Sequence, residues 1–181
     1  MKFPLPVLLG IAFGLSEAGL SILKRSRDDS VDADESTLRV LWITILAAMT
    51  AGIVVSHHAS RAAFASAIAF WSGCALFAIG LALRWYSILY LGRYFTVNVA
   101  IHSRHEVIET GPYKWIRHPS YSGALLAFLG VALCLENWLS LALIMLPVTW
   151  AFAWRMSKEE TALANALGAG PLAASSRHVE A

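Results

Sequence analysis

Charged residues are what this sequence has least of. Asp, Glu, Lys and Arg make up only 14% of its 181 residues, whereas soluble globular chains carry roughly 25%. Apolar side chains account for 57%, and the mean hydropathy is +0.60. The 14 basic and 12 acidic residues leave a formal net charge of +2 without a long basic run, which argues against nucleic-acid binding. The composition therefore predicts a membrane protein rather than a soluble domain.

Motifs for metals, disulfides and soluble nucleotide binding are also missing. Cys74 and Cys134 lie in apolar runs without CxxC spacing or clustered histidines, so neither a zinc site nor a disulfide framework is expected. We expect both to pack as small apolar side chains. His57 and His58 have no further ligands nearby and are interpreted as interfacial anchors. The absence of a GxGxxG turn after a strand pattern excludes a Rossmann-type domain.

Long apolar runs are abundant and define the organisation of the chain. A helix needs about 20 mainly apolar residues to cross a hydrocarbon core of roughly 30 Å. The predicted spans are about 3–23, 40–59, 62–83, 121–136 and 138–154. The last two come from one apolar stretch that Glu136-Asn137-Trp138 divides into a helical hairpin. We therefore predict an all-α integral membrane protein with five transmembrane helices in a single domain, 1–181.

The basic residues predict the orientation of these spans, because Lys and Arg are retained in cytoplasmic loops. With five spans, every Lys and Arg except Lys2 and Arg61 falls on one side. That side holds the polar segment 24–38, expected to be a solvated connection, the connecting segment 84–120 and the tail 155–181. We therefore expect these segments and the C-terminus to be cytoplasmic.

The most informative stretch is GPYKWIRHPSYSG, residues 111–123. A proline disfavours helical geometry in the residue before it and fits the first turn of a helix. The fourth span is therefore expected to begin at Pro119, with His118 extended at its mouth and Tyr113 brought close by the Gly-Pro turn. Such a helix start favours an anion, and Arg117 adds a positive charge. Arg-His-Pro at a membrane boundary is also typical of a simple basic anchor, so both interpretations stay open.

The fifth span ends in RMSKEE, residues 155–160, and the hairpin returns this end to the start of the fourth span. Arg155 and Glu159 share a helix face. Adjacent Glu159 and Glu160 are unfavourable next to lipid unless a polar or cationic group lies against them. The alternative is a solvated helix end with an ordinary ion pair, worth about 0.3–0.5 kcal/mol.

The order of HEVIETGPYKWIRHPSYSG, a membrane hairpin and RMSKEETALANALG resembles the isoprenylcysteine carboxyl methyltransferases and their prokaryotic homologues. The similarity covers about half the chain, residues 84–168. It implies S-adenosylmethionine as methyl donor, bound at the cytoplasmic face, and a lipophilic substrate that enters from the bilayer. No metal is required, because methyl transfer from a sulfonium is an in-line displacement that depends on alignment and exclusion of water.

The resemblance also implies roles for individual residues. Cofactor contacts are implied for His105, Val107, Ile108, Tyr113, His118, Pro119, Tyr121 and Glu160. Positions near the transferred methyl group and a substrate carboxylate are implied for Arg117, Arg155 and Glu159. The tail after Gly168 lacks the aromatic residues and basic ending of the family, so no role as a lid is carried over to it.

The acceptor is not encoded by the cofactor motifs. Fixed arginines suit a carboxylate nucleophile, which favours carboxyl methylation of an isoprenylcysteine-like substrate. Three other hypotheses stay open: methylation of a phospholipid amine or a thiol, a nicotinamide-dependent membrane reductase of related architecture, and a non-enzymatic transporter or scaffold.

Polar residues inside the first and third spans need a separate explanation. Glu17 is ionisable within a span and is therefore a candidate functional residue; alternatively, it pairs with Lys24 or faces a neighbouring helix. Arg84 and Trp85 are interpreted as an anchor that snorkels to the interface. Small residues predicted to pack against another helix are Gly10, Gly14 and Gly19.

Overall fold

The computed structural model describes residues 4–23, 32–64, 66–91 and 110–166. These residues form the helices α1 (Pro4–Leu23), α2 (Asp32–His58), α3 (Ala67–Leu91), α4 (Pro119–Cys134) and α5 (Trp138–Ala166), with the short 3-10 helices η1 (Ser60–Ala62) and η3 (Gly111–Lys114). Within the described ranges the only β pairing is one isolated bridge. The predicted all-α class is confirmed.

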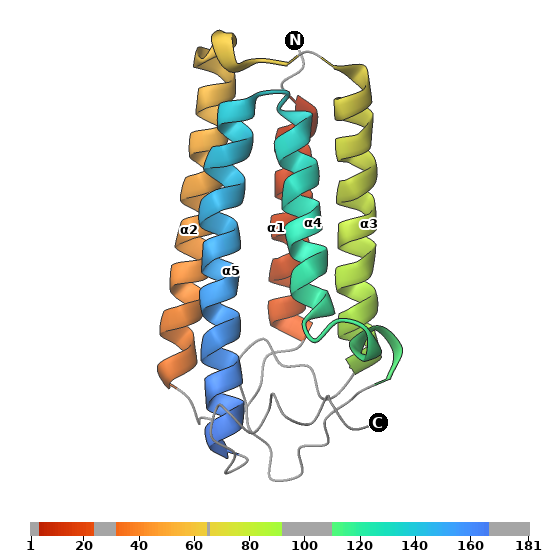
Figure 1. The fold of residues 1–181 in the computed structure, drawn as a ribbon, viewed down its shortest axis with the longest axis vertical. Helices are drawn as coiled ribbons and strands as arrows, with labels where there is room; N and C mark the ends of the chain where they lie inside the picture. The colour runs from red at the N-terminus through yellow and green to blue at the C-terminus, as the bar shows by residue number, and fades with distance from the viewer. Residues whose placement is uncertain (1–3, 24–31, 65, 92–109, 167–181) are drawn as a thin grey trace.

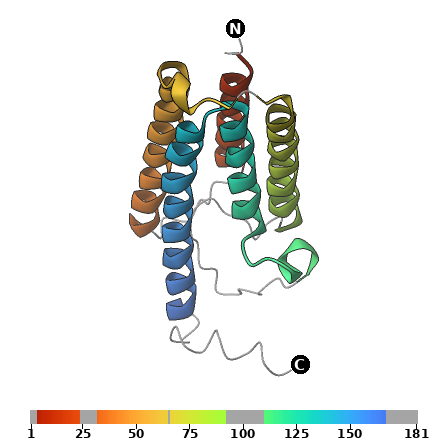
Figure 2. The ribbon, with the colours of Figure 1, turned by 45° about the horizontal axis from the view of Figure 1, so that its top comes forward.

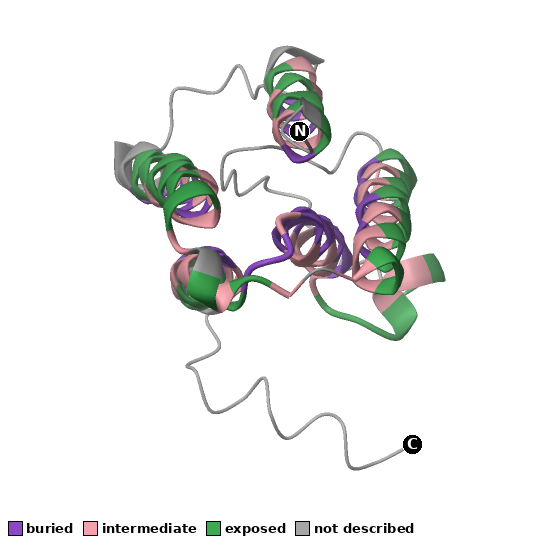
Figure 3. Ribbon diagram, turned by 90° about the horizontal axis from the view of Figure 1, so that it is seen from above, coloured by how far each residue is buried: buried purple, intermediate pink, exposed green. Residues whose placement is uncertain are grey.

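Successive helices run in alternating directions and lie side by side as an upright bundle (Figure 1). Helix α4 packs against α1, α3 and α5, and α2 packs against α5. Viewed along the bundle, the buried residues gather on α4 (Figure 3). The helix η3, the start of α4 and the end of α5 all lie at one end of the bundle (Figures 1 and 2). The turn between α4 and α5 lies at the other end.

Three of the described helices are long and apolar enough to cross a membrane: Thr37–His58, Ala67–Leu91 and Trp138–Thr161. Shorter apolar helices cover Leu5–Leu20 and Pro119–Cys134. Large apolar side chains such as Leu15, Trp71 and Leu146 are exposed on the outside of the bundle, where they suit contact with lipid. The protein is an all-α integral membrane protein.

Three helices continue beyond the predicted apolar runs, and α3 begins five residues later than predicted, at Ala67. Helix α2 begins at Asp32, inside the segment 24–38 that was expected to be a connection. Helix α3 begins after 62 and continues through 84–91, which were assigned to the connecting segment. Helix α5 continues past residue 154 to Ala166. Hydropathy marks only the apolar part of a helix, whereas backbone hydrogen bonding continues through polar residues until the chain is interrupted.

The turn between α4 and α5 confirms the predicted hairpin. Glu136 has a positive φ of 51°, and its side chain accepts a hydrogen bond from the Ser66 N–H at 3.0 Å. Asn137 donates to the Ala59 carbonyl at 2.9 Å. These bonds join the hairpin to the segment between α2 and α3. The end of the bundle away from η3 is thereby closed by partly buried polar contacts.

The core joins α1, α4 and α5 through aromatic rings. The ring centroids of Phe13 and Phe128 are 4.6 Å apart, and those of Phe128 and Phe152 are 6.4 Å apart.

Cys74 and Cys134 are free thiols whose Sγ atoms lie 3.7 Å apart where α3 meets α4. Cys134 is buried, as predicted, whereas Cys74 is only half-buried.

Glycines bring the backbones of α3 and α4 into direct contact. A Cβ atom added at Gly80 would lie 2.5 Å from the Ala127 nitrogen and 2.6 Å from the Gly123 oxygen. The same holds for the other glycines of this contact, Gly73, Gly123 and Gly130. The prediction for α1 is wrong at two positions, because a Cβ atom at Gly14 or Gly19 would meet no described atom within 4 Å. Packing glycines are therefore concentrated between α3 and α4.

We expect Gly80→Ala to lower the free energy of unfolding by about 1–3 kcal/mol, because the added methyl group forces two backbones apart. Gly14→Ala is the matched control, since it gains the same helix propensity of about 1 kcal/mol without a collision. Unfolding by sodium dodecyl sulfate in mixed micelles, followed by circular dichroism, measures both. Equal stability of the two variants would contradict the close contact.

Candidate functional site

The candidate site lies where α4 begins and α5 ends. Pro119 is the first residue of α4, as predicted, and His118 precedes it with φ −123° and ψ 63°. No side chain caps this helix start. The backbone N–H groups of a first helical turn have no partner within the helix, so the start of α4 can receive hydrogen-bond acceptors.

His118 and Glu160 form the accessible part of the site. The His118 Nε2 and Glu160 Oε1 atoms are 3.1 Å apart. The His118 ring also stacks on Tyr121, with centroids 5.7 Å apart and an interplanar angle of 19°. The side chains of His118 and Glu160 are 24% and 53% exposed. An aromatic face and a carboxylate are therefore accessible beside the helix start.

Tyr121, Arg155 and Glu159 form the buried part of the site. The Tyr121 hydroxyl donates to Glu159 Oε1 and accepts from Arg155 Nε at 3.0 Å. Arg155 Nε lies 3.3 Å from Glu159 Oε1, so the predicted pairing of these two residues along α5 is confirmed. Tyr121 adds a link from α4 that spacing along α5 alone could not predict.

Thr37 is a site residue that sequence reasoning missed. Arg155 is 2% exposed, and its Nη1 donates to Thr37 Oγ1 at 3.3 Å. Thr37 was assigned to a solvated connection, but it lies in α2 and is buried. The apolar runs of the sequence do contain a signal for this contact. Thr37 lies three residues before the apolar run that begins at Val40, and Arg155 directly follows another, so antiparallel helices place both at a similar depth.

Tyr113 contacts α3 rather than α5. Its hydroxyl donates to the Ser87 carbonyl at 3.2 Å. The helix η3 that carries it begins at Gly111, whose φ of +59° and contact with the Tyr90 ring leave no room for a side chain. Burial raises the pKa of Tyr113 to about 12, and the positive charge of Arg84 opposes this rise.

The remaining predicted residues are distributed as follows. Pro119 is buried at the start of α4. Arg117 is exposed and makes no hydrogen bond or ion pair with another residue of the described ranges. His105, Val107 and Ile108 lie outside the described residues, as does the tail after Ala166. The structure thus brings together five predicted residues: His118, Tyr121, Arg155, Glu159 and Glu160.

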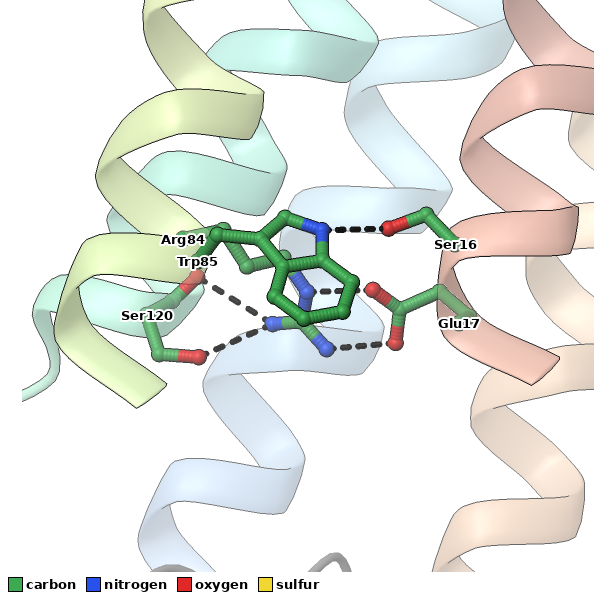
Figure 4. A network of polar contacts seen from close by, with 5 residues as sticks. All are labelled: Ser16, Glu17, Arg84, Trp85 and Ser120. Atoms are coloured by element: carbon green, nitrogen blue, oxygen red, sulfur yellow. Dashed lines mark hydrogen bonds and ion pairs between the residues drawn. The ribbon is translucent and has the colours of Figure 1, made fainter. Parts of the chain in front are cut away.

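A second polar network lies next to the site and corrects one prediction (Figure 4). Arg84 is buried and pairs with Glu17, and Trp85 Nε1 donates to Ser16 Oγ at 2.7 Å. Arg84 and Trp85 are therefore not a snorkelling anchor. The reason is that α3 continues beyond Arg84, which places the guanidinium inside the bundle, opposite a carboxylate. For Glu17, the prediction that it faces a neighbouring helix is confirmed, and its partner there is Arg84.

Fold and site together define an integral membrane protein with buried and exposed charges grouped at one end of a helical bundle. Residues 73–165 match the isoprenylcysteine carboxyl methyltransferase (ICMT) family, and the chain belongs to this family. The matched region runs from α3 to α5 and contains the five residues that the site brings together.

Individual relatives are similar over the same part of the chain. The chain is 26% identical over 94 residues to the uncharacterized protein YpbQ of Bacillus subtilis, covering 51% of this chain and 56% of that protein. It is 34% identical over 90 residues to a probable protein-S-isoprenylcysteine O-methyltransferase of Oryza sativa subsp. japonica, covering 49% and 47%. It is also 34% identical over 90 residues to the protein-S-isoprenylcysteine O-methyltransferase of Saccharomyces cerevisiae, covering 49% and 38%. The chain spans about half the length of the curated relatives it matches.

The environment of Tyr113 gives a testable pH dependence. Because its pKa is raised from 10 to about 12 in the folded protein, its stabilising contribution is present below pH 10 and is lost as the pH rises toward 12. The measurement is the tyrosinate absorbance of the wild-type protein minus that of Tyr113→Phe as the pH is raised. We expect this difference, which belongs to Tyr113, to titrate near pH 12. The unfolded protein is the control, with a titration near pH 10. A titration near pH 10 in the folded protein would show that the hydroxyl is not buried.

Proposed function

We propose that this chain is an S-adenosylmethionine-dependent methyltransferase that methylates the carboxylate of an isoprenylcysteine-like lipophilic substrate. The observation that carries the proposal is the grouping of His118, Tyr121, Arg155, Glu159 and Glu160 within a chain of this family. The names of the rice and yeast relatives support the same reaction.

The donor set of the site fits the charges of S-adenosylmethionine, which has a carboxylate, an ammonium group and a sulfonium. The uncapped start of α4 offers N–H groups to a carboxylate. Glu160 offers a partner for an ammonium group, and the stacked His118 and Tyr121 rings offer an aromatic face to a sulfonium. We therefore assign these residues to cofactor binding, with His105, Val107, Ile108 and Tyr113 as further contacts. When bound, the cofactor supplies an electrophilic methyl group.

Arg155 is assigned to the acceptor carboxylate. Its Nη1 donates to the neutral hydroxyl of Thr37, and a carboxylate can replace that hydroxyl with a stronger, charge-assisted bond. Tyr121 and Glu159 hold the Nε side of the guanidinium, so the planar group has a defined orientation. Arg117 is exposed beside the start of α4 and adds positive charge at the entrance.

Methyl transfer then depends on alignment and on exclusion of water. The acceptor carboxylate must keep its negative charge while it loses its water shell, which a fixed guanidinium permits without neutralising it by proton transfer. Because Arg155 is 2% exposed, its charge is little screened by solvent. No metal and no covalent protein intermediate are needed for this displacement.

We also propose that the site faces the cytoplasm and that the substrate arrives laterally from the bilayer. The distribution of Lys and Arg among the loops supports this orientation. The exposed apolar surface of the helices supports contact with membrane lipid and with a prenyl-like chain. No nucleic acid is expected as a partner.

Cofactor binding is tested with S-adenosylhomocysteine by isothermal titration calorimetry of the detergent-solubilised protein. His118→Ala and Glu160→Ala are each expected to weaken binding by about 1–3 kcal/mol, the range for losing a charge-assisted hydrogen bond. This corresponds to roughly a 5- to 150-fold higher Kd. His58→Ala is the control, because His58 lies at the end of α2 away from the site. Unchanged binding by both folded site variants would exclude this cofactor site.

The acceptor class is tested by tritiated methyl transfer to N-acetyl-farnesylcysteine, its amide and phosphatidylethanolamine. Arg155→Lys loses the planar fork, so we expect turnover of the acid to fall more than tenfold while cofactor affinity changes less than about twofold. The exposed Arg39→Lys on α2 is the control. Activity on phosphatidylethanolamine alone, insensitive to Arg155, would contradict carboxyl methylation. Binding of a nicotinamide cofactor, or of no cofactor, would support a reductase or a non-enzymatic protein instead.

A further inference from the structure

Helices α1, α3 and α4 are joined by a buried polar cluster next to the site. We call it the α1–α3–α4 cluster; it consists of Ser16, Glu17, Arg84, Trp85 and Ser120 (Figure 4). The sequence marks Glu17 as a candidate functional residue but does not link any of these five residues to the start of α4. Two of them, Ser16 and Glu17, lie in α1, outside the region that matches the family.

Arg84 is the centre of this cluster. Its Nε and Nη2 atoms donate to the two oxygens of Glu17, the second at 2.5 Å. Its Nη1 donates to the backbone carbonyl of Ser120 at 3.2 Å and to the Ser120 hydroxyl at 3.0 Å. The Arg84 and Glu17 side chains are 10% and 8% exposed. All three guanidinium nitrogens therefore donate hydrogen bonds. Because the Glu17 carboxylate holds Nε and Nη2, it fixes the direction in which Nη1 points toward Ser120.

Ser120 connects this cluster to the site. It lies in the first turn of α4, between Pro119 and Tyr121 in the chain. The neighbouring side chains of His118 and Tyr121 reach Glu160 and Glu159 on α5. The first turn of α4 is thus bonded to α5 through side chains and to α3 through the backbone carbonyl and the hydroxyl of Ser120.

We propose that Arg84 and Glu17 are positioning residues of the site. Glu17 orients Arg84, and Arg84 holds the first turn of α4 so that His118 and Tyr121 meet their partners on α5. Helix α1 thereby contributes to the site without contacting the cofactor or the substrate. The effect on cofactor affinity rests on the proposed function, whereas the effect on the position of Tyr121 does not.

The chain offers a control for a purely structural role of the same residues. Trp85 Nε1 donates to Ser16 Oγ and so joins α1 to α3 as Arg84 does, but this bond has no link to α4. Ser16→Ala removes it and leaves the bonds of Ser120 in place. Arg84→Lys keeps a positive charge for Glu17 but has a single nitrogen, so it cannot bind both carboxylate oxygens and Ser120 in the same geometry.

Two measurements separate positioning from stability. In protein labelled with 3-fluorotyrosine, the fluorine resonance of Tyr121 is assigned by its loss in Tyr121→Phe and reports the first turn of α4. Calorimetry gives the Kd for S-adenosylhomocysteine, and thermal unfolding gives the Tm. We expect Arg84→Lys to shift the Tyr121 resonance and to raise the Kd at least fivefold. We expect Ser16→Ala to lower the Tm but to leave the resonance unchanged and the Kd within twofold.

Ser120→Ala is the second test variant, because it retains the buried ion pair and decides the question if Arg84→Lys does not fold. We expect it to shift the Tyr121 resonance in the same direction. The proposal is overturned if the folded variants leave the Tyr121 resonance unchanged, or if Ser16→Ala shifts it equally. Failure of the wild-type protein to bind S-adenosylhomocysteine would instead refute the proposed function, and the resonance would still decide the positioning role.

Discussion

Glycines let the backbones of α3 and α4 touch, and this contact determines where the polar residues of both helices lie. A Cβ atom at Gly123 would be 2.6 Å from the backbone nitrogen of Arg84. The backbone of α3 at Arg84 therefore lies directly against α4. The guanidinium of Arg84 can then reach the Ser120 carbonyl. A wider separation, imposed by larger residues, would remove that bond. Packing in the middle of the bundle thus controls the geometry at its end.

Two buried arginines impose the second constraint, because a guanidinium in an apolar environment is unfavourable without partners. Arg84 has the carboxylate of Glu17, and Arg155 has that of Glu159. The first turn of α4 bonds to both, through Ser120 and Tyr121. Each of the two N-terminal helices also supplies one acceptor, Glu17 from α1 and Thr37 from α2. Helices outside the family region are therefore tied to it by an ion pair from α1 and a hydrogen bond from α2, as well as by packing.

The sequence predicted the elements that depend on local chemistry. Five helices, the hairpin turn at Glu136, the helix start at Pro119 and the pairing of Arg155 with Glu159 all follow from hydropathy, proline geometry or helical spacing. Helix ends were wrong where polar residues continue a helix beyond the membrane core.

Contacts between distant segments were not predictable from these signals. The Arg84–Glu17 pair joins residues on α1 and α3, and nothing in either local sequence specifies which helices are neighbours. Thr37 was missed for the same reason, although its depth could be inferred from the apolar runs. The glycine spacing in α1 predicts a small-residue face but not its partner, and the glycines in close backbone contact lie in α3 and α4.

The length of α5 places the site at a boundary between two solvents. From Trp138 to Arg155 the helix rises about 26 Å at 1.5 Å per residue, and Glu160 lies roughly 7 Å further. A hydrocarbon layer about 30 Å thick that began at Trp138 would therefore end between the guanidinium and the last glutamate. A molecule dissolved in the bilayer diffuses in two dimensions and is held at this depth by its own polar group. For the lipophilic substrate of the proposed function, encounter with the arginine is then a search over a surface rather than through a volume.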